Sequence, residues 1–133
     1  MKIVVGFDGS EHSRRALQRA TELAGADGQL VVVASAEARL GAPVTEGGRL
    51  DPSTTEHAHR ALSEARDLVG GKGLNAEFVE TFGDPGAAII EAAEGADLVV
   101  VGSRGISRLE RVLLGSVSTK VVQRASCDVL VVR

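Results

Sequence analysis

Two short runs of β-branched residues restrict the fold more than any other feature of the sequence. Leu30–Val33 and Leu98–Val101 each hold four consecutive apolar residues, three of them valine. Strands of parallel sheets, which helices cover on both faces, have this composition, whereas strands with one solvated face alternate polar and apolar residues. The segments between these runs carry apolar residues at helical spacing. We therefore expect strands that alternate with helices, the arrangement of an α/β protein with a parallel sheet.

The rest of the chain completes a pattern of five strands and four helices in one domain, residues 1–133. The apolar faces of the first two helices are expected to include Leu23 and Leu68. One long loop is expected at 38–52. The strands are predicted at 2–8, 29–35, 74–82, 98–101 and 128–132. The helices are predicted to begin at Gly9 or Ser10, at Ser53 or Thr54, at Asp84 and at Gly115.

Charge and aromatic content argue against a nucleic-acid partner. The chain has 15 Lys and Arg against 18 Asp and Glu, a formal net charge of −3, so it has no basic excess. Aromatic residues make up only 2%, without Trp or Tyr, and platforms that stack single-stranded nucleic acid need such side chains. No apolar stretch approaches the roughly 20 residues that span a membrane. Because the N-terminus runs directly into a predicted strand, without a signal peptide, we expect a cytoplasmic protein with no membrane partner.

A glycine-punctuated segment joins the fourth predicted strand to the last predicted helix. It reads Gly102-Ser-Arg-Gly105, then nine residues, then Gly115-Ser-Val-Ser118. Glycine lets a backbone approach a ligand closely, and the amides at the start of a helix lack intrahelical partners and attract anions. The segment therefore indicates a phosphate site. In an open α/β sheet that site lies at the carboxyl ends of the strands, where the sequence places Asp8, Ser35 and Gly102.

Three common nucleotide or phosphate motifs do not fit the chain. No G-x4-G-K-[ST] loop is present, and Gly70-Gly-Lys-Gly73 follows a predicted helix instead of preceding one. The first strand leads into Gly6-Phe-Asp-Gly9, which is not the G-x-G-x-x-G of dinucleotide-binding folds. A response-regulator receiver needs an acidic pair after the first strand, an Asp at the third strand and a Lys near the fifth. Only Asp8 fits that pattern, and only loosely.

The glycine spacing resembles the ATP-binding signature of the universal stress protein family. Gly102-x2-Gly105-x9-Gly115-Ser116, followed by Val117-Ser118, has the family's pattern. Lys2–Ser10, residues 97–105 and Cys127–Val132 also resemble family segments, so the likeness covers the whole chain. The resemblance implies a Rossmann-like open sandwich, a five-stranded, doubly wound parallel sheet in the strand order 3-2-1-4-5 with helices on both faces. It also implies an ATP-binding protein of stress response or signalling.

The resemblance implies a role for each matching residue. Gly102, Arg104 and Gly105 would face the ribose and the phosphates of ATP. Asp8 would approach the ribose or a phosphate-bound Mg²⁺. Adenine would be flanked by the backbone near Ser35, with Gly6 and Val101. The β- and γ-phosphates would be wrapped by Gly115, Ser116, Val117 and Ser118.

Simpler roles stay open for several of these residues. Asp8 would repel a bare triphosphate, so a place beside ATP needs Mg²⁺ or the ribose hydroxyls, and the alternative is an Asx turn that feeds the first helix. Ser116 and Ser118 are equally suited to capping a helix, which uses the same amides as a phosphate. The three histidines, His12, His57 and His59, share no face with a cluster at metal spacing and are expected on the surface.

The sequence favours a binding protein over an enzyme. It shows no Ser-His-Asp or Cys-His arrangement, no paired carboxylates and no base for water attack on a γ-phosphate. We expect nucleotide-dependent binding with at most slow ATP hydrolysis. Two alternatives stay open: a dimeric interaction module that binds no nucleotide, and a variant that prefers AMP or cyclic AMP. A homodimer is expected through Asp128–Val132, because no later helix covers the edge of this apolar strand.

Overall fold

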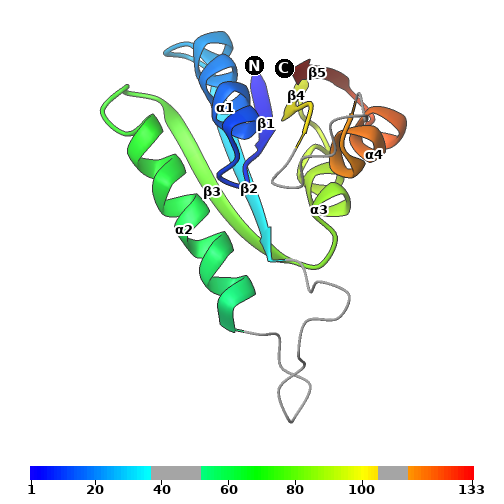
Figure 1. The fold of residues 1–133 in the computed structure, drawn as a ribbon. Coiled ribbons are helices and arrows are strands. Elements are labelled where there is room, and N and C mark those ends of the chain that lie inside the picture. The colour runs from blue at the N-terminus through cyan, green and yellow to red at the C-terminus, as the bar shows by residue number, and fades with distance from the viewer. Residues whose placement is uncertain (37–51, 105–113) are drawn as a thin grey trace.

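The computed structural model describes residues 1–36, 52–104 and 114–133. In these residues, five strands form one parallel sheet in the order β3-β2-β1-β4-β5, and four helices cover it (Figure 1). The predicted doubly wound α/β fold and its strand order are confirmed. The strands are β1 (Lys2–Gly6), β2 (Gln29–Ala36), β3 (Asn75–Phe82), β4 (Leu98–Gly102) and β5 (Asp128–Val132).

The two faces of the sheet carry separate apolar cores. Val32 of β2 packs into the first core, with the helices α1 and α2, and its neighbour Val31 packs into the second, with α3 and α4. Successive strand residues point to opposite faces, so the valine runs hold no polar residue because both faces are covered. No helix in the described part of the chain is long and apolar enough to cross a membrane. The helices are α1 (Glu11–Ala24), α2 (Pro52–Val69), α3 (Pro85–Ala92) and α4 (Ser116–Arg124).

Several boundaries differ from the prediction by one or two residues. The first strand ends at Gly6, because the polar groups of Asp8 bond to the start of α1 and not along the sheet. The fourth strand runs on to Gly102, paired with Val132 of β5. The second strand extends to Ala36, the third begins at Asn75, and α2 begins at Pro52.

Two leucines that were predicted on buried helix faces lie at the surface instead. Leu23 of α1 and Leu68 of α2 each leave 42% of their surface exposed. On α1 the buried stripe includes Ser13 and Thr21. Their hydroxyls donate to backbone carbonyls one turn earlier in the chain, at 2.9 and 2.7 Å. Because those hydroxyls already have partners, the two polar residues can be buried, and Leu23 is left at the margin of the stripe.

Gly102, at the end of β4, lies where the first turns of α1 and α4 meet the sheet. A Cβ on Gly102 would lie 2.8 Å from both the carbonyl carbon and the Cβ of His12, and 2.9 Å from the His12 carbonyl oxygen. From α4, the Ser118 hydroxyl donates to the Gly102 carbonyl at 2.7 Å. The absence of a side chain on Gly102 therefore allows α1 to approach β4 closely.

Replacing Gly102 by Ala should destabilise the fold more than replacing Gly6 by Ala. At Gly6 the new Cβ would meet Cδ1 of Ile89 at 2.5 Å, the far end of a flexible side chain, whereas at Gly102 it meets helix backbone. We expect Gly102→Ala to lower the free energy of unfolding by about 1–3 kcal/mol, and Gly6→Ala to lower it less. Urea denaturation of both variants gives the comparison. Equal losses would show that α1 moves away from β4 without cost.

Asp84 connects α3 to α4 on the second face of the sheet. As the N-cap of α3, its carboxylate accepts the Ala87 N–H at 2.9 Å, and it also forms an ion pair with Lys120 of α4. The bond from the Lys120 ammonium, followed by the bond from the Ala87 amide, lowers the pKa of Asp84 from its ordinary value of 3.8. The ionised carboxylate therefore stabilises the folded chain.

Asp84→Asn should show how much of this stabilisation depends on charge. Asn can still accept the Ala87 N–H but brings no charge to Lys120. Because the folded-state pKa lies below the unfolded-state value, the contribution of the carboxylate is present above about pH 5 and is lost as the pH falls through the folded-state pKa. Urea denaturation at stepped pH should show wild type more stable than Asp84→Asn, by at most about 1 kcal/mol, at neutral pH. A difference that persists at acid pH would contradict a role for the charge.

Candidate functional site

The helices described after β1 and β4 lie on opposite faces of the sheet, although the two strands are neighbours. β1 is followed by α1 on the first face, and α4, the next described helix after β4, packs on the second face (Figure 1). In open α/β sheets, ligands bind at the carboxyl ends of the strands where connections diverge in this way. The candidate site therefore consists of the segment after β1, the end of β4 and the first turn of α4.

The start of α4 differs from the starts of α1 and α3. Ser10 caps α1 by accepting the Ser13 N–H at 3.3 Å, and Asp84 caps α3. Gly115 is the N-cap residue of α4, and no side-chain hydrogen bond caps this helix. The first amides of a helix have no intrahelical acceptor, and in the part of the chain that the structure describes no side chain accepts from the N–H groups of residues 116–118. Such amides, at the positive end of the helix dipole, are suited to bind an anion.

Backbone and hydroxyl bonds attach this turn to the end of β4. The Gly115 N–H donates to the Ser103 carbonyl at 2.7 Å, and the Ser103 N–H donates to the Val132 carbonyl at 2.8 Å. Ser118 is 3% exposed. Because its hydroxyl donates to Gly102, only its backbone N–H remains for a ligand. Ser116 is exposed, so both its amide and its hydroxyl can meet a ligand.

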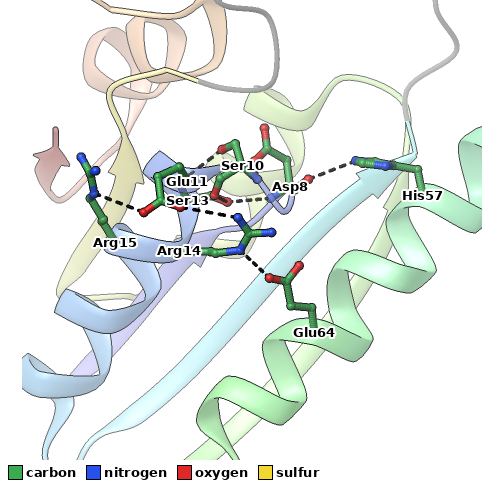
Figure 2. Close-up of polar contacts among 8 residues, drawn as sticks. All are labelled: Asp8, Ser10, Glu11, Ser13, Arg14, Arg15, His57 and Glu64. Carbon is green, nitrogen blue, oxygen red and sulfur yellow. Dashed lines mark hydrogen bonds and ion pairs between the residues drawn. The ribbon is translucent and has the colours of Figure 1, made fainter.

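Asp8 lies just beyond β1, and its carboxylate is part of the turn into α1 (Figure 2). Oδ1 accepts the Ser10 N–H at 2.9 Å, which is the Asx turn that the sequence left as an alternative. The backbone N–H of Asp8 donates to Ser13 Oγ at 3.4 Å. The Asp8 carbonyl oxygen lies 3.0 Å from Nε2 of His57, on α2. These contacts give Asp8 a fixed position with one carboxylate oxygen committed to the turn.

The three residues predicted beside adenine lie on three neighbouring strands. Gly6 and Val101 face α3, where Ile89 fills the space next to Gly6, and Val101 is only 3% exposed. Ser35 is half-buried, and its hydroxyl donates to the Gly83 carbonyl at 2.9 Å. Ile89 and Val101 thus fill the second face of the sheet, the one that α3 and α4 cover, beside these strand ends. The resemblance assigns the contacts of adenine to the backbone at these strand ends, and that assignment stays a prediction.

The segment after β4 is described as far as Arg104, which is half-buried. Gly105, which the sequence assigns to the ribose and phosphates, lies outside the described residues. Among the residues that are described, no group of three or more His, Cys, Asp or Glu side chains could hold a metal ion.

Sequence reasoning missed a contact between His12 and Ser103 beside Gly102. Instead of lying on the open surface, His12 is half-buried, and its Nδ1 lies 3.1 Å from Oγ of Ser103, which is 4% exposed. His57 is exposed, as predicted, but it reaches the Asp8 carbonyl. His59 is exposed and lies near Glu80. Residues 12 and 103 are far apart in sequence, so only the packing of α1 on β4 brings them together. The one signal available was a serine inside the glycine pattern.

Comparisons with known proteins show the family of this chain. The Universal stress protein family matches residues 1–133. Universal stress protein Rv1636 of Mycobacterium tuberculosis is 36% identical over a 137-residue alignment that covers 98% of this chain and 94% of the relative. A universal stress protein solved in complex with cAMP is 32% identical, with a TM-score of 0.75, covering 100% of this chain and 97% of that one. The universal stress protein from Archaeoglobus fulgidus in complex with dAMP is 26% identical, with a TM-score of 0.77, covering 100% of this chain and 98% of that one. The chain therefore belongs to the universal stress protein family.

Proposed function

We propose that this chain is a nucleotide-binding stress or signalling protein that holds ATP at the carboxyl edge of the sheet, between β1 and β4. The observation that carries the proposal is the start of α4, which no side chain of the described residues caps and which is attached to the end of β4 beside Gly102, while side chains cap α1 and α3. The complexes of two relatives with cAMP and dAMP support an adenine nucleotide as the ligand class. The β- and γ-phosphates would lie on the amides of residues 116–118.

The helix dipole supplies only part of the affinity that such a site needs. Its interaction with an anion is worth about 0.3–2 kcal/mol, whereas micromolar binding requires about 8 kcal/mol. Hydrogen bonds between an amide and a charged oxygen add about 1.5–3 kcal/mol each. Several amides from 116–118, together with the backbone around a base, are therefore required, and the exposed Ser116 hydroxyl can add a weaker bond.

Asp8 fits a Mg²⁺ that arrives with ATP. Proteins commonly hold Mg²⁺ through one or two carboxylates, with substrate phosphates and water as the other ligands. Asp8 uses Oδ1 for the Ser10 amide, which leaves the second oxygen for one ligand bond. The cation would also remove the repulsion between this carboxylate and the triphosphate. The ribose hydroxyls are the other partner that an ionised Asp8 accepts without repulsion.

Binding without rapid turnover fits the groups around this edge. Among the described residues, one ring nitrogen of each histidine near the site has a protein neighbour, Nδ1 of His12 at Ser103 Oγ and Nε2 of His57 at the Asp8 carbonyl, and Oδ1 of Asp8 accepts the Ser10 N–H. A base for water attack must lie within hydrogen-bond reach of that water. We therefore propose at most slow hydrolysis of ATP. Phosphorus NMR of the protein with ATP and Mg²⁺ measures it directly.

Ser116→Pro should weaken ATP binding while keeping the fold. Proline is tolerated at the first helical position, where it removes an N–H that has no intrahelical partner. Gly115 already has the extended backbone, φ −68° and ψ 168°, that a residue before proline adopts. The loss of one amide bond to a charged phosphate should lower the affinity about 10- to 100-fold. Isothermal titration with ATP and Mg²⁺ measures this change.

Ser116→Ala is the matched control, because it removes the hydroxyl and keeps the amide. We expect it to change the affinity far less than Ser116→Pro does. Titrations with AMP and cyclic AMP test the alternative ligands. If the protein prefers either one and Ser116→Pro does not change its affinity, the phosphate does not bind at the start of α4. No binding heat from any of the three nucleotides, together with no nucleotide found by mass spectrometry of the purified protein, would favour the interaction module instead.

The open edge of β5 is the proposed contact of a homodimer. β5 is the last strand of the sheet and pairs only with β4 among the described strands. Val129–Val132 are half-buried, so apolar side chains remain partly exposed along an unpaired strand. Such an edge favours pairing with another strand. A second copy, added antiparallel about a two-fold axis, would satisfy both edges with the same residues.

Val131→Pro should convert the dimer into a folded monomer. The Val132 carbonyl accepts from Ser103 and therefore faces β4, so the alternation along the strand turns the polar groups of Val131 to the open edge. Proline there removes an outward N–H and leaves the bonds to β4 in place. Val131→Ala keeps the N–H and should stay dimeric. Light scattering at micromolar concentration distinguishes these states, and a monomeric wild type would refute the dimer.

A further inference from the structure

Ser103 joins three parts of the fold at the carboxyl edge of the sheet. Its N–H donates to Val132 of β5 at 2.8 Å, and its carbonyl accepts from Gly115, before α4, at 2.7 Å. Its hydroxyl lies 3.1 Å from Nδ1 of His12, in the first turn of α1. Only 4% of Ser103 is exposed. The place of Ser103 therefore determines the place of Gly115, and with it the first turn of α4.

His12 is the side chain that bonds to Ser103 among the described residues. It reaches Ser103 because Gly102, next in the chain, has no Cβ to keep the His12 backbone away. The bond forms with either tautomer of the ring, since Nδ1 can accept the hydroxyl proton or donate its own. Both backbone bonds of Ser103 exist without His12, so loss of the ring should leave the fold intact. Because the Ser103 hydroxyl would lose its partner, Ser103 and the start of α4 should be held less firmly.

We propose that His12 is a positioning residue for the start of α4: through Ser103 it holds Gly115, and hence the amides of residues 116–118, in the place from which they bind phosphate. The effect on affinity rests on the proposed nucleotide site, whereas the effect on Gly115 concerns the free protein alone. His12 needs no contact with the ligand for this role, because the hydroxyl of Ser103 transmits its position to the backbone.

Amide hydrogen exchange in the free protein tests the positioning. In His12→Ala, the Gly115 amide should exchange about tenfold faster, the effect of losing one neutral hydrogen bond that supports it. His12→Asn should restore the wild-type rate, because its side-chain amide offers an oxygen or N–H near the place of Nδ1. The Ala125 amide, bonded to Val121 at the far end of α4 at 2.9 Å, is the internal control. An unchanged rate at Gly115, or an equal rise at Ala125, would overturn the proposal.

A double-mutant cycle tests whether the same bond acts on nucleotide affinity. His12→Ala and Ser103→Ala should each weaken ATP binding about three- to tenfold, and the double variant should bind no more weakly than either single one. His12→Asn should bind nearly as wild type does. If His12→Ala weakens binding as much in the Ser103→Ala background as in wild type, His12 acts on the ligand directly and the proposal is wrong. If wild type binds no nucleotide, the proposed function fails, and the exchange of Gly115 still decides the role of His12.

Discussion

The close approach of α1 to the end of β4 is the constraint on which the carboxyl edge of this sheet depends. Gly102 has no Cβ, so the backbone of His12 can lie against it, and the same glycine carries the carbonyl that accepts the Ser118 hydroxyl of α4. The first turns of two helices from opposite faces thus meet at one residue. A larger residue would push one turn away from the sheet, and the ring of His12 would no longer reach Ser103. The glycine that the sequence suggests for ligand approach is required first by the protein's own packing.

Among α1, α3 and α4, whose starts the structure describes, the capping residue separates the two helix starts that serve the fold from that of α4, which is open to an anion. Glycine at an N-cap costs only a few tenths of a kcal/mol relative to serine or aspartate, whereas each bond from an amide to a charged oxygen contributes about 1.5–3 kcal/mol. At Gly115 the chain gives up little stability by leaving the amides of α4 without a capping side chain. At Ser10 and Asp84 the side chains use the equivalent amides, so those helix starts offer less to a ligand.

Features that depend on residues close together in the sequence could be predicted. Contacts that depend on packing between residues far apart in the sequence could not. Valine runs, helical spacing and the Pro after Asp84 are local signals, and they lead to the observed sheet and helices. Leu23 was misplaced because helical spacing ranks residues by polarity and cannot show that Thr21 bonds within its own helix. The contact of His12 with Ser103 could not be predicted either, since it exists only because α1 crosses the end of β4. The Asx turn of Asp8, by contrast, was within reach, because its donor is two residues away.

The way in which the candidate site would bind phosphate also bears on catalysis. The amides of α4 are held in place before any ligand arrives, by the bonds of Gly115 and Ser118 to the end of β4. Donors fixed in this way bind a phosphate in the ground state, and only interactions that strengthen in the transition state accelerate a reaction. Turnover would need a further group to orient a water molecule, and one oxygen of Asp8, a carboxylate at this edge, is already bonded to the turn that starts α1. Fixed amides with a restrained carboxylate fit the proposed function, in which the presence or absence of a retained nucleotide, and not its hydrolysis, would be the signal.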